Sequence, residues 1–140
     1  PLIMSSREMA EAIRKESSVS EVSSMIRLAS MTIVGIGAMD NSATILKSSI
    51  LGHNDFLLLN MKGAVGDVIC HFIDKDGNLV DTDIDSRLVS VPLGTLNELE
   101  NVIGVAAGKH KVSAITAALK GGYLDILITD ESTAALLYQD

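Results

Sequence analysis

Two short stretches combine glycine with charged side chains, and each is typical of a site for an anion or a polar ligand. The first runs from Gly108 to Lys111 (GKHK) and the second from Gly63 to Asp67 (GAVGD). A glycine turn that leads into a helix leaves backbone N–H groups unpaired, and these groups attract anions. Cationic side chains are unfavourable at this end of a helix unless an anion lies between them. Residues 109–111 therefore predict a phosphate or carboxylate site, with a solvated basic patch as the alternative.

Asp67 places a carboxylate at the end of the second glycine turn. One interpretation of this carboxylate is a cap on the backbone element that follows Gly66. Gly35 and Gly37 end an apolar run (IVGIGA), and glycine lets the backbone approach a ligand closely. Since many strands end in glycine, these two residues carry weight only together with the other segments.

The remaining polar residues form no recognisable catalytic or metal-binding pattern. His53 and His71 are isolated, no two ligand-type residues have the spacing of a zinc site, and no serine lies in a nucleophile elbow. The stretch from Asp74 to Asn78 (DKDGN) begins like a calcium loop but lacks its terminal glutamate, so we expect a plain turn. Cys70 lies in the apolar, strand-like run at 69–73 and is expected to be buried and inert. We therefore predict no catalytic residue, no metal site and no cofactor.

The composition excludes several classes of function. The chain has 140 residues, 47% of them apolar, which suits one folded domain. Its 11 Lys and Arg residues against 18 Asp and Glu give a net charge of −7, so direct contact with nucleic acid is not expected. A single cysteine favours a reducing cytoplasm, and no apolar run approaches the roughly 20 residues of a membrane span. We expect a cytoplasmic location without membrane contact.

The elements that must position these residues are typical of an α/β fold. Apolar runs predict parallel strands at 31–36, 102–106 and 124–128, with an antiparallel region at 69–91 between the first two. Within that region we expect a hairpin around the 74–78 turn and a further strand at 87–91.

Helical spacing of apolar residues predicts helices between these strands. They are expected to begin near Ser5, Ser18, Asp40, Asp55, Thr95, Lys109 and Asp130. The second helix is expected to bury Val22, Met25, Ile26 and Ala29 along one face.

Together these segments resemble the effector-binding domain of the SorC family of bacterial transcriptional regulators, which respond to sugars or sugar phosphates. The resemblance rests on VGIG at 34–37, KGAVGD at 62–67, GVAAG at 104–108 with the following helix, and LITD at 127–130. It extends over nearly all of the chain. Ala107 is a departure, because many members have a second glycine there, and its methyl group would narrow the turn.

The resemblance implies a fold, a domain organisation and partners. The fold would be a Rossmann-like parallel sheet with helices on both faces and a small antiparallel insertion, similar to sugar-phosphate isomerases and deaminases and incomplete in this chain. Residues 1–140 would be the C-terminal part of a sugar-binding domain. The first part of that domain and a DNA-binding domain would precede Pro1. The implied partners are a sugar or sugar-phosphate effector, operator DNA through the absent domain, and further copies of the protein in dimers and tetramers.

The resemblance also assigns roles to site residues. Asp67 is expected to contact sugar hydroxyl groups, and Lys111 is expected to face the ligand. Gly35, Gly37 and Gly66 are expected to line the pocket with their backbone.

Gly108 is added to these ligand-binding candidates by the anion-binding turn described above. The competing interpretation is an isomerase or deaminase of the same fold, in which Asp67 or Asp40 would abstract a proton next to a carbonyl group. The loop from Ala38 to Asn41 lacks the acidic or histidine-rich pattern of those enzymes, so the sensor is favoured.

Overall fold

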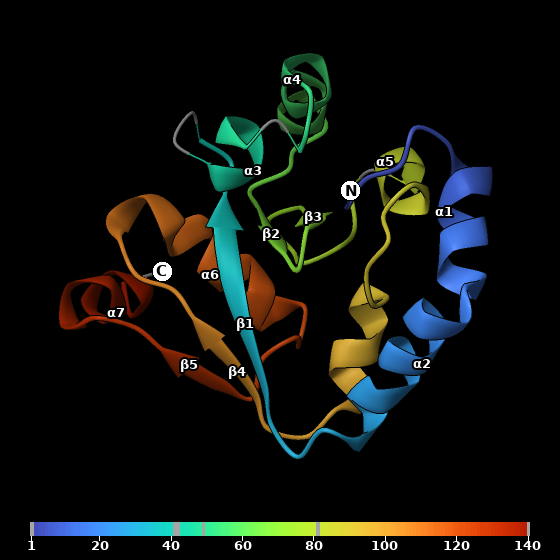
Figure 1. Cartoon of the computed structure of the whole chain (residues 1–140). Coiled ribbons are helices and arrows are strands. Elements are labelled where there is room, and N and C mark those ends of the chain that lie inside the picture. Colours follow the sequence, from blue (N-terminus) through green and yellow to red (C-terminus); the bar gives the residue numbers. More distant parts are fainter. Residues whose placement is uncertain (1, 41–42, 49, 81, 140) are drawn as a thin grey trace.

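A sheet lies at the centre of the computed structural model, which describes residues 2–40, 43–48, 50–80 and 82–139 (Figure 1). Its five strands have the order β3-β2-β1-β4-β5. Their bounds are Thr32–Ala38 (β1), Gly66–Val68 (β2), His71–Ile73 (β3), Val102–Val105 (β4) and Ile126–Ile128 (β5). The β1, β4 and β5 strands are parallel, whereas β2 pairs antiparallel with β1 and β3 pairs antiparallel with β2.

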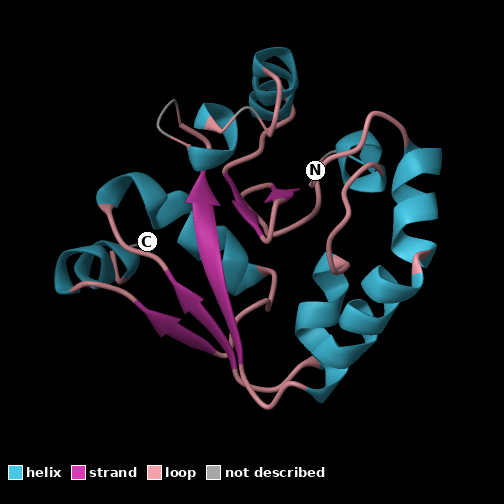
Figure 2. Ribbon diagram, viewed as in Figure 1, coloured by secondary structure: helices cyan, strands magenta, loops and turns pink. Residues whose placement is uncertain are grey.

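Helices surround this sheet unevenly. Their bounds are Arg7–Lys15 (α1), Ser17–Met25 (α2), Thr44–Lys47 (α3), His53–Met61 (α4), Thr82–Ser86 (α5), Val112–Lys120 (α6) and Glu131–Leu137 (α7), with 3₁₀ turns at Ile26–Leu28, Leu93–Glu98 and Lys109–Lys111. Figure 2 shows α6 behind the sheet, α3 and α4 beyond the end of β1, and α1 and α2 as an arm to one side. None of the described helices is long and apolar enough to cross a membrane.

Two clusters of buried side chains hold these elements together. In the first, Val34 and Ile36 of β1 pack against α6, which contributes Ile115. Val34, Ile36 and Ala38 alternate with more exposed residues along β1, as the two-residue period of a strand requires. The second cluster lies under α3 and α4 and includes Ile45, Leu51, Phe56, Leu59, Phe72 and Ile84.

The predicted α/β fold and its parallel strands are confirmed, and the antiparallel region also contains a hairpin that the sequence did not predict. This hairpin joins β2 to β3 through Ile69 and Cys70. Both turn residues have positive φ, 47° and 68°, as a two-residue hairpin turn requires. Asparagine and glycine normally supply this conformation, so the sequence IC gave no turn signal. Cys70 thus lies in a turn, and not in a strand as predicted.

The 74–78 turn itself is present, held by the carboxylate of Asp74. This carboxylate accepts hydrogen bonds from the backbone N–H groups of Asp76 and Asn78, both at 2.9 Å. The predicted hairpin around this turn is present but short. Leu79 returns antiparallel to Ile73 in an isolated bridge, and the N–H of Val80 donates a hydrogen bond to the carbonyl of Phe72 at 3.0 Å.

Two further elements of this region differ from the prediction. The expected strand at 87–91 is reduced to an isolated bridge between Leu88 and Ile3. The α5 helix was not predicted, because it is a single turn of polar residues around Ile84.

The predicted buried face of the second helix is wrong as well. No residue of α2 is buried, and Val22 and Met25 are 63% and 59% exposed. The apolar spacing is present, but α2 belongs to the arm that stands away from the core in Figure 1.

Candidate functional site

A cavity of about 520 Å³ opens at the C-terminal end of β1. Open α/β sheets bind ligands outside this end of their strands. The lining residues are Gly35, Ile36, Gly37, Ala38, Asp40, Ala43, Thr44, Ile45, Ile50, Asp67, Ile69, Cys70, His110 and Lys111. The cavity thus combines the ends of β1 and β2 with the α3 segment and the turn before α6.

Asp67 reaches the cavity from β2, where it is paired with Gly37 of β1. Its carboxylate lies close over the backbone of β1, since a Cβ at Gly37 would overlap the Oδ1 atom of Asp67. The Oδ2 atom accepts a hydrogen bond from the backbone N–H of Cys70 at 3.1 Å. Burial raises the pKa of Asp67, opposed by the Cys70 N–H and by the charges of Lys111 and His71. Asp67 is therefore a largely desolvated hydrogen-bond acceptor at the cavity.

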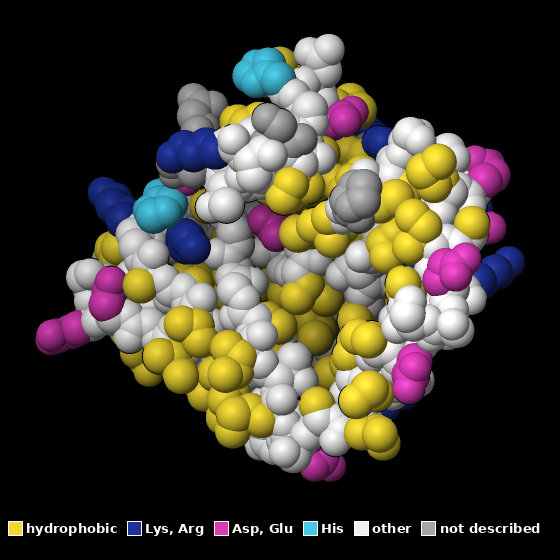
Figure 3. Space-filling model, in the orientation of Figure 1, with side chains coloured by type: hydrophobic (Ala, Val, Ile, Leu, Met, Phe, Trp, Pro, Cys, Tyr) yellow, Lys and Arg dark blue, Asp and Glu magenta, His cyan; other side chains and the backbone are white. Residues whose placement is uncertain are grey.

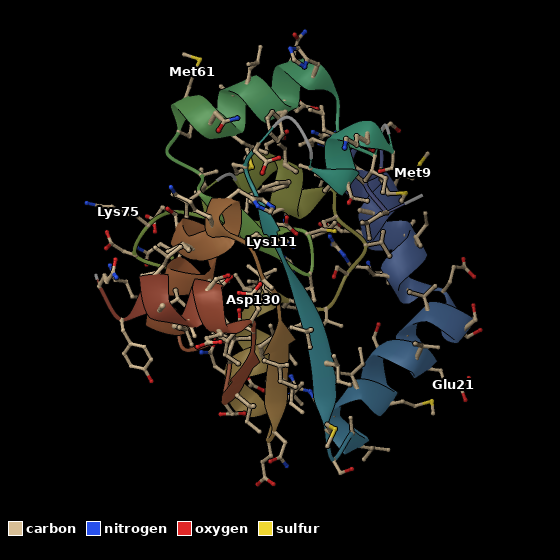
Figure 4. All side chains as sticks on the ribbon, turned by 90° about the vertical axis from the view of Figure 1, so that its left-hand side faces the viewer. Met9, Glu21, Met61, Lys75, Lys111 and Asp130 are labelled. Atoms are coloured by element: carbon tan, nitrogen blue, oxygen red, sulfur yellow. The ribbon has the colours of Figure 1, made fainter. Side chains whose placement is uncertain are left out.

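Lys111 approaches the same cavity from the other side. Its Nζ atom donates a hydrogen bond to the backbone carbonyl of Ile36 at 2.8 Å (Figure 4). An ammonium group has three N–H donors, so this bond leaves donors for a ligand. Lys111 lies in the 3₁₀ turn, and α6 begins only at Val112, one short turn later than predicted.

The four predicted glycines have different surroundings. Gly35 and Gly37 line the cavity, whereas Gly66 and Gly108 are not among its lining residues. Gly66 lets β2 lie against Ala114 of α6, because a Cβ there would overlap that side chain. A ligand-binding role of all four glycines stays a prediction.

Gly108 has a φ of 118°, which favours glycine. Its N–H donates a hydrogen bond to the Oγ1 atom of Thr133 at 2.7 Å. This N–H group is therefore already bonded within the protein.

One wall of the cavity comes from segments that the sequence did not predict to be part of a site. Thr44, Ile45 and Ile50 come from the α3 segment, and Ile69 and Cys70 come from the hairpin turn. No local signal links these segments to Asp67, because only the path of the chain brings them together. The wall is mainly apolar and lies opposite charged groups, an arrangement that suits a ligand with a carbon skeleton and several polar substituents.

Buried polar contacts fix the hairpin that carries Asp67. His71 is 4% exposed, and its ring nitrogens contact the carboxylate of Asp85 and, at 2.7 Å, the carbonyl of Val91. These contacts tie β3 to α5 and to the chain that follows it. Next to His71, burial raises the pKa of the Cys70 thiol to about 11, so it is almost fully protonated near neutral pH.

The described residues do not gather into a metal centre. Within the part of the chain that the structure describes, no group of three or more His, Cys, Asp or Glu side chains is placed to hold a metal ion. His71 belongs instead to the buried contacts around the hairpin.

Comparisons with known proteins point to one family. The family model described as "Putative sugar-binding domain" matches residues 1–139. The transcriptional regulator LsrR of Klebsiella pneumoniae is 42% identical over 137 residues, which are 96% of this chain and 42% of that protein. LsrR of Escherichia coli is 39% identical over 140 residues, covering 98% of this chain and 44% of that protein. The chain thus spans less than half the length of these relatives.

Solved structures agree with these matches. The sorbitol operon regulator SorC of Klebsiella pneumoniae has a TM-score of 0.89 at 28% identity, over 98% of this chain and 44% of that one. A DeoR family transcriptional regulator of Listeria monocytogenes has a TM-score of 0.92 at 27% identity, over 98% of this chain and 56% of that one. Both are similar to this chain in fold over almost its whole length.

Proposed function

This chain belongs to the sugar-binding domain family of LsrR- and SorC-type transcriptional regulators, and on that premise we propose that its cavity binds a sugar or sugar-phosphate effector. The family gives the chain an effector-sensing role in regulation. What we add as a proposal is where the effector binds and which side chains hold it.

The convergence of Asp67 and Lys111 on one cavity carries this proposal. Asp67 offers a desolvated carboxylate to hydroxyl groups, and Lys111 offers a cation to a phosphate or another anionic group. Gly35 and Gly37 keep the floor of the cavity open at β1, and Ile45 contributes to the apolar wall. A sugar phosphate has all three kinds of surface: hydroxyl groups, an anion and carbon–hydrogen faces.

The other functions of the whole protein are proposals too. We propose that a further part of the longer protein binds operator DNA, and that the protein is a homo-oligomer in the cytoplasm. An effector that binds one assembly state more tightly shifts the population towards that state, and this shift would change DNA affinity. LsrR and SorC are described as regulators of transcription and of an operon, which supports the DNA-binding part of this proposal.

The isomerase or deaminase alternative is not favoured. Asp40 and Asp67 both line the cavity, but no relative compared above is described as an enzyme. A shared fold does not by itself transfer an activity.

Calorimetric titration of the natural protein that contains these residues tests the proposal. The probes are glucose 6-phosphate, fructose 6-phosphate, sorbitol 6-phosphate and ribose 5-phosphate, each beside its unphosphorylated sugar. We expect at least one probe to bind, and we expect Asp67→Asn and Lys111→Ala each to weaken it at least tenfold. A hydrogen bond to a charged group contributes about 1.5–3 kcal/mol, which corresponds to such a factor.

The two substitutions also separate the parts of the ligand. Lys111→Ala should weaken the phosphorylated probe more than the free sugar, whereas Asp67→Asn should weaken both. Lys120→Ala is the matched control, because this exposed lysine at the other end of α6 lies outside the cavity. Unchanged affinity in both site variants would contradict this assignment of the cavity.

A further inference from the structure

Thr133 is a polar residue at a fully buried position of α7, where it is 0% exposed. Its backbone N–H donates a hydrogen bond to the carboxylate of Asp130, the cap of α7, at 2.7 Å. A buried hydroxyl group destabilises a fold unless it has hydrogen-bond partners. One partner of the Thr133 hydroxyl group lies outside α7, at Gly108, directly before the turn that carries Lys111. This contact links α7 to the effector cavity.

The hydroxyl group of Thr133 lies between two polar groups. Its Oγ1 atom accepts a hydrogen bond from the N–H of Gly108 at 2.7 Å. On the other side, hydrogen bonds from the backbone and the side chain of Thr133 lower the pKa of Asp130, because its carboxylate accepts them. A hydroxyl group that donates to a carboxylate is itself a stronger acceptor. Asp130 therefore orients the hydroxyl group so that its oxygen atom faces Gly108.

Gly108 connects Thr133 to the backbone of Lys111. The carbonyl of Gly108 accepts a hydrogen bond from the N–H of Lys111 at 2.9 Å. The ring of His110 lies so close to Gly108 that a Cβ there would overlap it. The Nζ atom of Lys111 then reaches the carbonyl of Ile36 at the cavity. In Figure 4 the labels of Lys111 and Asp130 mark the two segments, which contact each other.

We propose that Thr133 is a positioning residue for Lys111, whose hydroxyl group holds the turn from which the ammonium group reaches the anionic group of the effector. This inference rests on the proposed function of the cavity. The Thr133 oxygen atom takes the place at the Gly108 N–H that an anion would occupy at a glycine turn. The preference for a phosphorylated ligand therefore depends on the side chain of Lys111 and on how it is held.

Loss of the Thr133 hydroxyl group would affect binding through Lys111. The N–H of Gly108 would then have lost its acceptor, and a buried donor without a partner is costly. The turn is expected to move so that this N–H reaches water, and Lys111 moves with it. Since a binding group must be held within about 0.5 Å of its productive position, the contact with the anionic group weakens.

Calorimetric titration of the natural protein, with the sugar phosphates named above and their free sugars, tests the effect on binding. Thr133→Val removes the hydroxyl group with little change in volume. It is expected to weaken the phosphorylated probe at least fivefold and the free sugar less than twofold. Thr133→Ser keeps the hydroxyl group and should stay within twofold of wild type for both. Ser132→Ala is the matched control, because the exposed Ser132 donates to the same Asp130 carboxylate, and it should also stay within twofold.

A double variant tests whether Thr133 acts through Lys111. If it does, Thr133→Val together with Lys111→Ala should bind the phosphorylated probe as Lys111→Ala alone does, within a factor of two. Losses that multiply in the double variant would overturn the proposal. Equal weakening of the phosphorylated and the free sugar by Thr133→Val would overturn it too, because that result indicates a general structural role.

Amide hydrogen exchange without any ligand tests the positioning step by itself. In Thr133→Val the N–H groups of Gly108 and Lys111 should exchange at least tenfold faster than in wild type, and Thr133→Ser should restore slow exchange. Acceleration that is equally large at Ile115 in α6 would show a loss of overall stability and would overturn the proposal. A wild-type protein that binds none of the probes would contradict the proposed function, whereas the exchange rates would still support or overturn the link from Thr133 to Lys111.

Discussion

At the scale of single residues, the site depends on glycines, which leave space at β1, as well as on its charged side chains. Gly37 leaves the space that the carboxylate of Asp67 occupies above β1. Gly35, two residues earlier on the same face of the strand, has no atom within 4 Å of the position where a Cβ would lie. Both glycines line the cavity, but only at position 37 does a neighbouring side chain, that of Asp67, leave no space for a Cβ.

Gly37→Ala and Gly35→Ala therefore form a matched pair. We expect Gly37→Ala to displace the Asp67 carboxylate and to weaken sugar or sugar-phosphate binding at least tenfold, because the new methyl group overlaps Oδ1. Gly35→Ala should keep the affinity within a factor of about three. Calorimetric titration of both variants measures the difference, and equal losses in the two would show that the Gly37–Asp67 contact is not the cause.

The raised pKa of Asp67 predicts a stability that depends on pH. Burial favours the protonated carboxyl group. The stabilisation that this group contributes to the folded state is therefore fully present below its pKa in the unfolded chain, about 3.9. That contribution is lost as the pH rises through the folded pKa. Asp67→Asn removes the titrating group. The free energy of unfolding of the variant should therefore increase relative to that of wild type between pH 4 and pH 7. Urea unfolding at both pH values measures this gain, and a difference that does not change with pH would contradict the prediction.

At the scale of elements, the loop before α6 is held in place by the helix that follows the last strand. Thr133 of α7 accepts the hydrogen bond from Gly108, and Asp130 caps α7 by accepting from the N–H of Thr133 at 2.7 Å. Asp130 also accepts from the hydroxyl of Ser132. The cap of α7 thus stabilises the turn that carries Lys111 (Figure 4).

Asp130→Ala is expected to destabilise the protein in a pH-dependent way. Hydrogen bonds from Thr133 and Ser132 lower the pKa of Asp130. The contribution of the carboxylate is therefore present above the unfolded pKa and lost as the pH falls through the folded pKa. Thermal melts should show a lower Tm for the variant at pH 7 and a smaller difference near pH 3. Asp130→Asn keeps a side-chain acceptor and should lie closer to wild type at pH 7, so equal losses in both variants would argue against the cap.

At the scale of the whole molecule, one face of the parallel strands is open. Figure 3 shows hydrophobic side chains gathered over β4 and β5, and the exposed members of the parallel strands are Ile33, Val105, Ile126 and Ile128. Parallel sheets are normally covered on both faces. The relatives compared above are about twice as long as this chain, which leaves room for further chain against this surface.

The open face and the β5 edge predict that this chain associates more readily than the longer protein. Unpaired strand edges and apolar patches both promote such association. Ile126→Lys and Ile128→Lys together should lower the light scattering of concentrated solutions of this chain while leaving its Tm nearly unchanged, because both side chains are already exposed. A wild-type chain that scatters as a clean monomer at high concentration would contradict the prediction.

The sequence by itself determined the parallel strands and the glycine turns, and it singled out Asp67 and Lys111, which both line the cavity. Strand periods and glycine conformations are local features, because they depend on neighbouring residues. The resemblance added the family, and the comparisons confirmed it. Asp67 and Lys111 lie more than forty residues apart. Asp67 lies in β2, which pairs antiparallel with β1, and Lys111 lies in the turn after β4, so the pairing of the sheet brings them to one cavity.

Only the tertiary structure decided the rest of the site and the surfaces. The turn at Ile69 and Cys70 has no turn-forming residues, so long-range packing must hold its positive φ angles. The cavity wall formed by Thr44, Ile45 and Ile50 joins Asp67 only because the chain returns over the end of β1. The apolar spacing predicted for α2 is present in the structure, but the face that it defines is exposed and not buried. Periodicity shows which side chains share a face, whereas what covers that face depends on the rest of the fold.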